Sequence, residues 1–331
     1  MKSRVGSLLF VLLVLLFTRA IGAPPPQSKE ATERPLPWAY AVPDGPVDKP
    51  EPDDGTLRHL PGASVAFTLT QVRDNNNPVD WYPGDHPQMP NVVAHGRKPS
   101  VTACAFCHFP NGKGRPENSG PAGLPYSYIV QQIDDFREGA RKTAEPGKKN
   151  TDQMIAIAKG MNDHEVQAAA EYFSSMNWTP WVKVVETDTV PKTRNAGGFF
   201  LRLEGSETEP LGQRILEVPV DTDATELLRD PRSGFIAYAP VGSIKKGAAL
   251  ATTGGAGKTV ACEACHGVGL KGNGYVPSLA GRSPSYLAQQ LYNFQHYARN
   301  GPGSQVMRPI VENLSPDDIL VLTAYVASLA P

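Results

Sequence analysis

Two copies of the motif Cys-x-x-Cys-His, at residues 104–108 and 262–266, hold all four cysteines of this 331-residue chain. The motif is the attachment site of c-type haem. Its three-residue step places both sulfurs on one side of a helical turn, where they can form thioethers to the haem vinyl groups. The adjacent histidine can then ligate the iron. The sequence therefore predicts two covalently bound haem c groups, held by Cys104, Cys107, Cys262 and Cys265, with iron ligands His108 and His266.

Other chemistries also use closely spaced cysteine pairs. Two such pairs can bind zinc, which takes four cysteine or histidine ligands, and one pair can act as a redox dithiol. The histidine that follows both pairs, together with the export signal described below, favours haem. No cysteine lies outside the motifs, so the chain has none left for a disulfide or a thiol nucleophile.

Composition and charge narrow the remaining classes of function. The chain is 40% hydrophobic, which is enough for a buried core, and its 32 prolines and 31 glycines indicate much loop. The formal net charge is −1, and this near-neutral balance gives no case for binding nucleic acid.

The first residues have the pattern of an export signal. Lys2 and Arg4 precede a ten-residue apolar run, which small residues follow. Cleavage after Ala20 is favoured over cleavage after Ala23, which would leave a proline next to the scissile bond. An uncleaved anchor is the alternative, but ten helical residues span only ~15 Å of a hydrocarbon core about 30 Å thick. We predict a periplasmic protein that meets the membrane only through partners or an uncleaved signal.

The chain also contains an internal duplication. An offset of 158 residues pairs Cys104 with Cys262 and aligns residues 123–141 with residues 281–299 without a gap. Further on, the offset falls to 153 and pairs Met154 with Met307. A unit of about 90 residues that occurs twice explains this register.

Helix signals recur in both units, so the predicted class is mainly α. A helix is expected to lead into each haem motif. Ser283 and Pro284 suit the start of another helix, and Asn162 and Ser315 suit the caps of the final helices.

Two segments fall outside the duplication. Residues 24–85 are Pro-rich and acidic, and we predict an extended arm that packs through its aromatic side chains. Between the units, short apolar runs broken by Gly, Pro, Asn and Asp predict short strands. Either segment can be a structural spacer or a docking surface. The predicted order is a signal peptide (residues 1–20), the arm (21–85), a first haem c domain or first repeat (86–180), a β-rich insert (181–240) and a second haem c domain or second repeat (241–331).

A methionine is the expected second axial ligand of each iron, because a thioether raises the reduction potential and suits an electron carrier. The second repeat contains only Met307, so elimination selects it, and the context Met307-Arg308-Pro309 predicts a loop there. The register then selects Met154 in the first repeat. Met161 is the alternative, but it aligns with Leu314, an apolar position before a helix where methionine serves as core filler.

The order of these features resembles the class I cytochrome c domain, and its repetition resembles the dihaem cytochrome c4 family. In each unit the haem motif precedes a Gly-x-x-x-x-Tyr helix ending in Arg, then Met, then a helix with alanine and tyrosine. The resemblance covers the two repeats and leaves out the arm and the insert. It implies two tandem class I cytochrome c domains, each a small helical fold around one haem, with a small β-rich insert between them.

The resemblance also implies roles for residues near the haems. A proline carbonyl often holds the iron-bound histidine in that family, and Pro277 matches it in the second repeat. The first repeat has Ser119 at that register, with two prolines nearby. Contacts with haem edges or propionates are expected, beside the alternative of helix packing and solvent exposure, for Tyr128, Arg141, Tyr286 and Arg299.

We therefore predict a dihaem cytochrome that passes single electrons between redox partners in a respiratory chain, as a carrier or an electron-transfer subunit. A dehydrogenase, an oxidase or another cytochrome would be the partner. The alternative is a dihaem enzyme of the peroxidase or thiosulfate-oxidising type. Such an enzyme needs an exchangeable iron, or a histidine or cysteine ligand, and the chain has no cysteine to spare.

Overall fold

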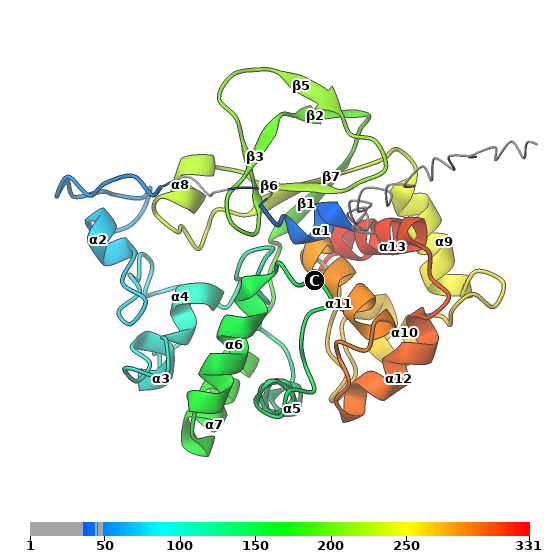
Figure 1. Cartoon of the computed structure of the whole chain (residues 1–331), viewed down its shortest axis with the longest axis horizontal. Coiled ribbons are helices and arrows are strands. Elements are labelled where there is room, and N and C mark those ends of the chain that lie inside the picture. Colours follow the sequence, from blue (N-terminus) through cyan, green and yellow to red (C-terminus); the bar gives the residue numbers. More distant parts are fainter. Residues whose placement is uncertain (1–35, 44, 46–48) are drawn as a thin grey trace, which may run out of the picture. The chain divides into compact units, whose positions relative to one another are not determined.

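The two repeats fold into two groups of helices, and the insert between them forms small sheets (Figure 1). The computed structural model describes residues 36–43, 45 and 49–331. Residues 35–331 form one unit by their internal contacts, and every contact discussed below lies within that unit. The predicted signal peptide lies outside the described residues.

Five helices make up the first repeat. They are α3 (Asn91–Ala94), α4 (Cys104–His108), α5 (Tyr126–Arg137), α6 (Lys149–Gly160) and α7 (Asp163–Ser174). The predicted cap of α7 is confirmed: the Asn162 side chain accepts the Glu165 N–H at 2.9 Å, and the Glu165 carboxylate accepts the Asn162 N–H at 2.9 Å. This reciprocal pair satisfies two N–H groups that have no partner inside the helix.

The second repeat contains α9 (Ser243–Thr253), α10 (Glu263–His266), the short 3₁₀ turn η1 (Val268–Leu270), α11 (Pro284–Gln295), α12 (Pro302–Val311) and α13 (Pro316–Ser328). Two further predicted caps are confirmed. The Ser283 hydroxyl accepts the Tyr286 N–H at 3.2 Å, and the Ser315 hydroxyl accepts the Asp318 N–H at 3.2 Å.

A helix precedes each haem motif, as predicted, but the first is short, and the loop prediction at Met307 is wrong. The helix expected before the first motif is only the four-residue α3, because Gly96 and Pro99 interrupt the segment that follows it. The loop expected around Met307 is instead part of α12, which continues through Pro309. A proline there removes one hydrogen bond to the carbonyl of Gln305. Because Gln305 is exposed, water can donate to that carbonyl instead.

A glycine occupies the same turn in both repeats. Gly96 and Gly254 have φ values of 63° and 71°, in the left-handed region that favours glycine. A Cβ on Gly96 would lie 2.2 Å from the carbonyl oxygen of Val101, and one on Gly254 would lie 2.4 Å from that of Thr259. Since Val101 and Thr259 are also 158 residues apart, the turn before each haem motif is built in the same way twice.

The insert contains seven short strands, all within described residues, and thus confirms the expected strand pattern. In the main sheet, β7 (Phe235–Ala239) lies between β1 (Val182–Glu186), to which it is parallel, and β6 (Leu216–Pro219), to which it is antiparallel. The other strands form two antiparallel pairs: β2 (Thr189–Pro191) with β5 (Thr208–Pro210), and β3 (Thr193–Asn195) with β4 (Phe200–Arg202). The short helix α8 (Thr222–Glu226) precedes β7.

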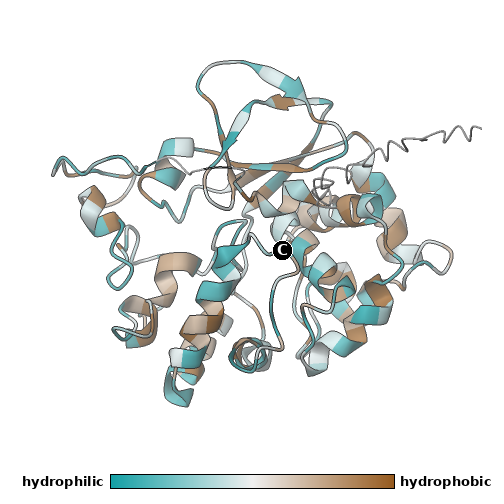
Figure 2. Cartoon of the chain, viewed as in Figure 1, coloured by the Kyte–Doolittle hydropathy of each residue, from teal (hydrophilic) through white to brown (hydrophobic). Residues whose placement is uncertain are grey.

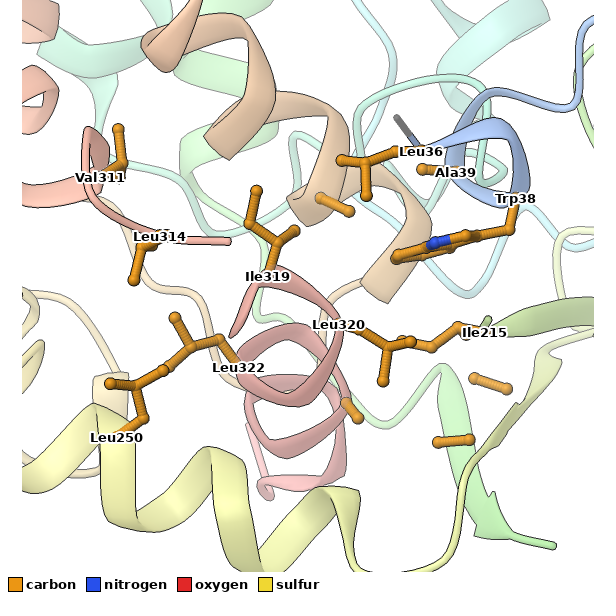
Figure 3. Packing of buried hydrophobic residues seen from close by; sticks show 14 of the residues in the cluster. Leu36, Trp38, Ala39, Ile215, Leu250, Val311, Leu314, Ile319, Leu320 and Leu322 are labelled. Atoms are coloured by element: carbon orange, nitrogen blue, oxygen red, sulfur yellow. The ribbon is translucent and has the colours of Figure 1, made fainter. Parts of the chain in front are cut away.

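The described part of the arm packs through its aromatic residues, as predicted. Trp38 and Tyr40, in α1 (Pro37–Tyr40), are buried in the core of the second repeat, where Trp38 lies near Leu320 and Ile215 (Figure 3). After α2 (Leu69–Val72), Trp81 is buried against the insert, and its Nε1 donates to the Leu228 carbonyl at 2.8 Å. The arm therefore ties the second repeat and the insert to the same stretch of chain.

Polar and apolar residues alternate along most helices, so that each presents both kinds of face (Figure 2). α5, α6 and α7 contribute to the first-repeat core, and α9, α11, α12 and α13 to the second. In the described part of the chain, we find no helix long and apolar enough to cross a membrane.

Two candidate haem c sites

The first haem motif forms α4, and a hydrogen bond fixes its histidine. His108 Nδ1 donates to the backbone carbonyl of Ser119 at 2.7 Å, and the imidazole lies 6.1 Å from the Phe173 ring. Burial lowers the pKa of His108, so the ring is neutral near pH 7. With Nδ1 engaged as a donor, Nε2 is the nitrogen available to a metal.

The second haem motif repeats this arrangement. His266, at the end of α10, donates from Nδ1 to the Pro277 carbonyl at 2.8 Å. Burial also lowers the pKa of His266. Ser119 and Pro277 are 158 residues apart, so both histidines use the same backbone carbonyl of the repeat.

The cysteine environments disfavour the two alternative chemistries. Burial raises the pKa of the Cys104 thiol to about 12 and also raises that of Cys262. A redox dithiol needs a thiol with a lowered pKa, so these pairs lack the activation that such chemistry requires. Zinc needs several converging ligands, and no cluster of three or more Cys, His, Asp or Glu residues that could hold a metal ion occurs among the described residues.

Each predicted methionine ligand packs against the same core as the first cysteine of its own motif. Met154, in α6, and Cys104 both lie against the core of the first repeat, and Met307, in α12, and Cys262 both lie against that of the second. Met154 and Met307 are half-buried. Met161 is a buried member of the first core, with 6% of its surface exposed.

The predicted arginine and tyrosine residues meet where the two repeats contact each other. Arg141 and Arg299 are paired in an isolated antiparallel bridge. Each reaches the tyrosine of the opposite repeat: Arg141 donates to the Tyr286 hydroxyl at 2.8 Å, and Arg299 donates to the Tyr128 hydroxyl at 3.3 Å. The expectation of a solvated arginine is therefore wrong, since both are buried.

This contact holds two buried positive charges. Neither arginine forms an ion pair with a carboxylate among the described residues, and Arg299 Nε has no hydrogen-bond partner there. Burial would raise the pKa of Tyr286, but the charges of Arg141 and Arg299 outweigh it and lower that pKa. Buried cations require anions nearby. The buried carboxylate of Asp135 supplies part of that charge for Arg141. The haem propionates, which are anionic, would fit the rest of this donor set.

Sequence reasoning missed two glutamines at this contact. The side-chain oxygen of Gln132 accepts from Arg141 at 2.8 Å and from Arg299 at 2.5 Å. Gln290 accepts from the same two arginines at 3.2 Å and 3.3 Å. Gln132 and Gln290 are 158 residues apart, so the repeat register could have selected them.

The two sites and the helical repeats around them define the chain as a protein with two haem c domains. The family model for cytochrome c matches residues 93–177 and 244–330, which together make up slightly more than half of the chain. The chain therefore belongs to the cytochrome c family. Its mainly α fold, with two cytochrome c domains and a small β-rich insert, is confirmed, as are two covalently bound haem c groups.

Several known proteins resemble this chain. It is 24% identical to the thiosulfate dehydrogenase electron acceptor of Stutzerimonas stutzeri (strain A1501), over 71% of this chain and 82% of the relative. It is also 24% identical to cytochrome c4 of Azotobacter vinelandii, over 69% and 85%. A solved structure of thiosulfate dehydrogenase from Marichromatium purpuratum gives a TM-score of 0.46 at 23% identity, covering 72% of this chain but only 39% of that longer one. The chain is thus a dihaem electron-transfer cytochrome similar to cytochrome c4.

Proposed function

We propose that His108 and Met154 are the axial ligands of the first haem iron, and that His266 and Met307 are those of the second. The covalent attachment would be through Cys104, Cys107, Cys262 and Cys265. The observation that carries this proposal is the matched pair of buried histidines, each held by the equivalent backbone carbonyl. The methionines support it, because each packs against the core that its own motif also contacts.

The carbonyls and the arginines have separate tasks in this proposal. The carbonyls of Ser119 and Pro277 fix the ring orientation of the histidines and make them better donors to iron. Arg141, Arg299, Tyr128 and Tyr286 would hold the propionates where the repeats meet. Their buried positive charge favours the reduced form of a nearby centre, because reduction adds negative charge.

The proposed role is that of a periplasmic carrier or electron-transfer subunit with redox-protein partners. A bound haem c supplies a one-electron centre that takes up and releases an electron. The polypeptide excludes water, sets the ligands and holds the charges that tune the potential. Residues 1–20 would direct export. Membrane association would come only through partners or an uncleaved signal, and nucleic acid plays no part.

The relatives suggest the kind of donor. Two matched proteins are described as electron acceptors of a thiosulfate dehydrogenase, which supports a dehydrogenase as one of the partners. An oxidase or a further cytochrome would accept the electron afterwards. The alternative of a dihaem enzyme has less support, because the proposal leaves neither iron with an exchangeable position.

Spectra of methionine variants test the ligand assignment. Met154→Ala and Met307→Ala should each remove the methionine–iron absorption of one haem and lower its reduction potential, because a thioether favours ferrous iron. Met161→Leu is the matched control, with a change of similar volume in the neighbouring core. It should leave both haem spectra unchanged. If Met161→Leu removes the absorption of the first haem and Met154→Ala does not, the assignment in the first repeat is wrong.

A further inference from the structure

The insert covers the first haem motif. Phe109, which directly follows His108, is buried in a cluster with Trp181, Phe199 and Phe235 of the insert. Such contacts exclude water from the loop after the motif. These side chains come from both ends and from the middle of the insert. The folded insert as a whole, and not one short segment of it, therefore covers the loop.

Polar contacts fasten this cover. Arg229 donates a hydrogen bond to the Phe106 carbonyl, inside the motif itself, and its guanidinium lies 4.2 Å from the centre of the Phe106 ring. Asn111 donates to the carbonyl of Pro231 in the insert at 2.6 Å. A partner protein cannot reach the loop unless these contacts open.

The equivalent loop of the second repeat is open. At an offset of 158 residues, Ala264 is equivalent to Phe106, and Val268 is equivalent to Pro110. Ala264 is exposed, and Val268 and Tyr275 expose 88% and 77% of their surfaces. Within the described chain, no hydrogen bond joins residues 263–276 to the insert.

The open loop carries little net charge. Its charged residues are Glu263 and Lys271, which have opposite signs. Both are held within the repeat: Glu263 accepts the Gly269 N–H at 2.9 Å, and Lys271 donates to the Pro331 carbonyl at 3.1 Å. The loop therefore offers a partner apolar side chains, with no excess of either charge.

We propose that a redox protein with an apolar, uncharged surface around its own centre docks on the second haem loop, residues 263–276, and that the insert closes the first loop to such partners. The first repeat would then exchange electrons only through the second. One electron leaves the reduced partner and reduces this chain, and no bond forms or breaks. This inference rests on the proposed function and adds the place and the chemistry of docking.

Electron transfer from two donors of different size tests the proposal on the holoprotein. The protein donor is a reduced blue-copper protein with an apolar patch over its copper, and the small donor is hexaammineruthenium(II). Val268→Glu places an unpaired charge in the proposed contact, which should slow the protein donor by about tenfold or more. Val220→Glu, at a 58% exposed site on the insert, is the matched control and should change that rate by less than about twofold. Neither variant should slow the ruthenium donor, which is a small cation.

Two further readouts test the same contact, one through its salt dependence and one through chemical labelling. Between about 20 mM and about 500 mM salt, the rate with the protein donor should change little, because the loop carries no excess charge. Hydroxyl-radical labelling should modify Tyr275 and spare Phe106, and saturating copper protein should protect Tyr275.

The outcomes distinguish failure of the docking proposal from failure of the proposed electron-transfer function. Equal effects of Val268→Glu and Val220→Glu, no effect of either, or strong labelling of Phe106 would overturn the docking proposal. So would a protein donor that fails to react while ruthenium reacts normally. Loss of reaction with both donors in the wild-type holoprotein would instead contradict the proposed electron-transfer function.

Discussion

Arg141 and Arg299 are partners in an antiparallel β-bridge between the two repeats, and both side chains are buried. The bridge extends on both sides, since Lys142 N–H donates to the Ala298 carbonyl at 2.6 Å and Asn300 N–H donates to the Ala140 carbonyl at 2.7 Å. The two repeats are thus related by an approximate twofold symmetry where they contact each other. Each repeat places its cation against the other's tyrosine.

Removal of one buried cation should lower a haem potential. Arg141→Gln takes away a positive charge that stabilises the reduced state, an effect on the order of 1 kcal/mol or about 40 mV for one electron. Redox titration of the holoprotein measures it. Arg141→Lys should keep most of the potential because it keeps the charge, and the exposed Lys142→Gln should have little effect. If Arg141→Gln leaves both reduction potentials unchanged, the arginines do not lie in the environment of a haem.

Substitution of the shared turn glycines should destabilise the fold. Alanine at Gly96 or Gly254 meets both an unfavourable φ and a nearby carbonyl oxygen, and should cost ~2 kcal/mol or more. Denaturant unfolding of the holoprotein measures this loss. Gly84→Ala and Gly303→Ala are matched controls, because a Cβ there has no atom within 4 Å and no positive φ to oppose it. Equal stability of Gly96→Ala and Gly84→Ala would contradict the described turn.

Glu217 should make stability depend on pH. It lies in β6, accepts a hydrogen bond from the Ser283 hydroxyl at 2.7 Å, and has one oxygen without a partner among the described residues. Burial, and to a smaller extent the charge of Glu117, raises the pKa of Glu217 to about 7. An unfolded glutamate has a pKa of about 4.3, so the folded protein binds the extra proton between these values.

Stability should therefore fall as the pH rises from about 4 to about 7, and level off above that. The loss is on the order of 3 kcal/mol over this range. Glu217→Gln keeps the hydrogen-bond acceptor and removes the titration, so its stability should vary less with pH. The exposed Glu207→Gln should behave as the wild type does. Identical pH profiles for Glu217→Gln and the wild type would contradict this account.

The haem motifs, the repeat and the helix caps could be predicted because their signals are local or periodic. The Cys-x-x-Cys-His motifs, together with the export signal, predict the cofactor, and Asn162 and Ser315 predict the starts of the helices that follow them. The carbonyl that holds His108 was harder to predict, because the backbone of Ser119 provides it and any residue type has a carbonyl. The alignment of the two repeats identifies the position of this carbonyl better than the residue type does.

The missed features are long-range or depend on context. Arg229 lies 123 residues from Phe106 in sequence, and no local pattern links the two. The prediction of a loop at Met307 is wrong for a different reason. A proline in the last turn of a short exposed helix loses a single hydrogen bond, so Pro309 does not end α12.

Spectroelectrochemical titration of the holoprotein tests the central claim most directly, because it reports haem number, ligation and potential together. The account predicts two one-electron transitions, both from low-spin haem, with the methionine–iron absorption present for both irons in the oxidised protein. Intact mass should show two haem additions on the same sample. A single transition, a high-spin haem, or the absence of the methionine absorption from either iron would contradict a dihaem electron-transfer protein with two His/Met centres.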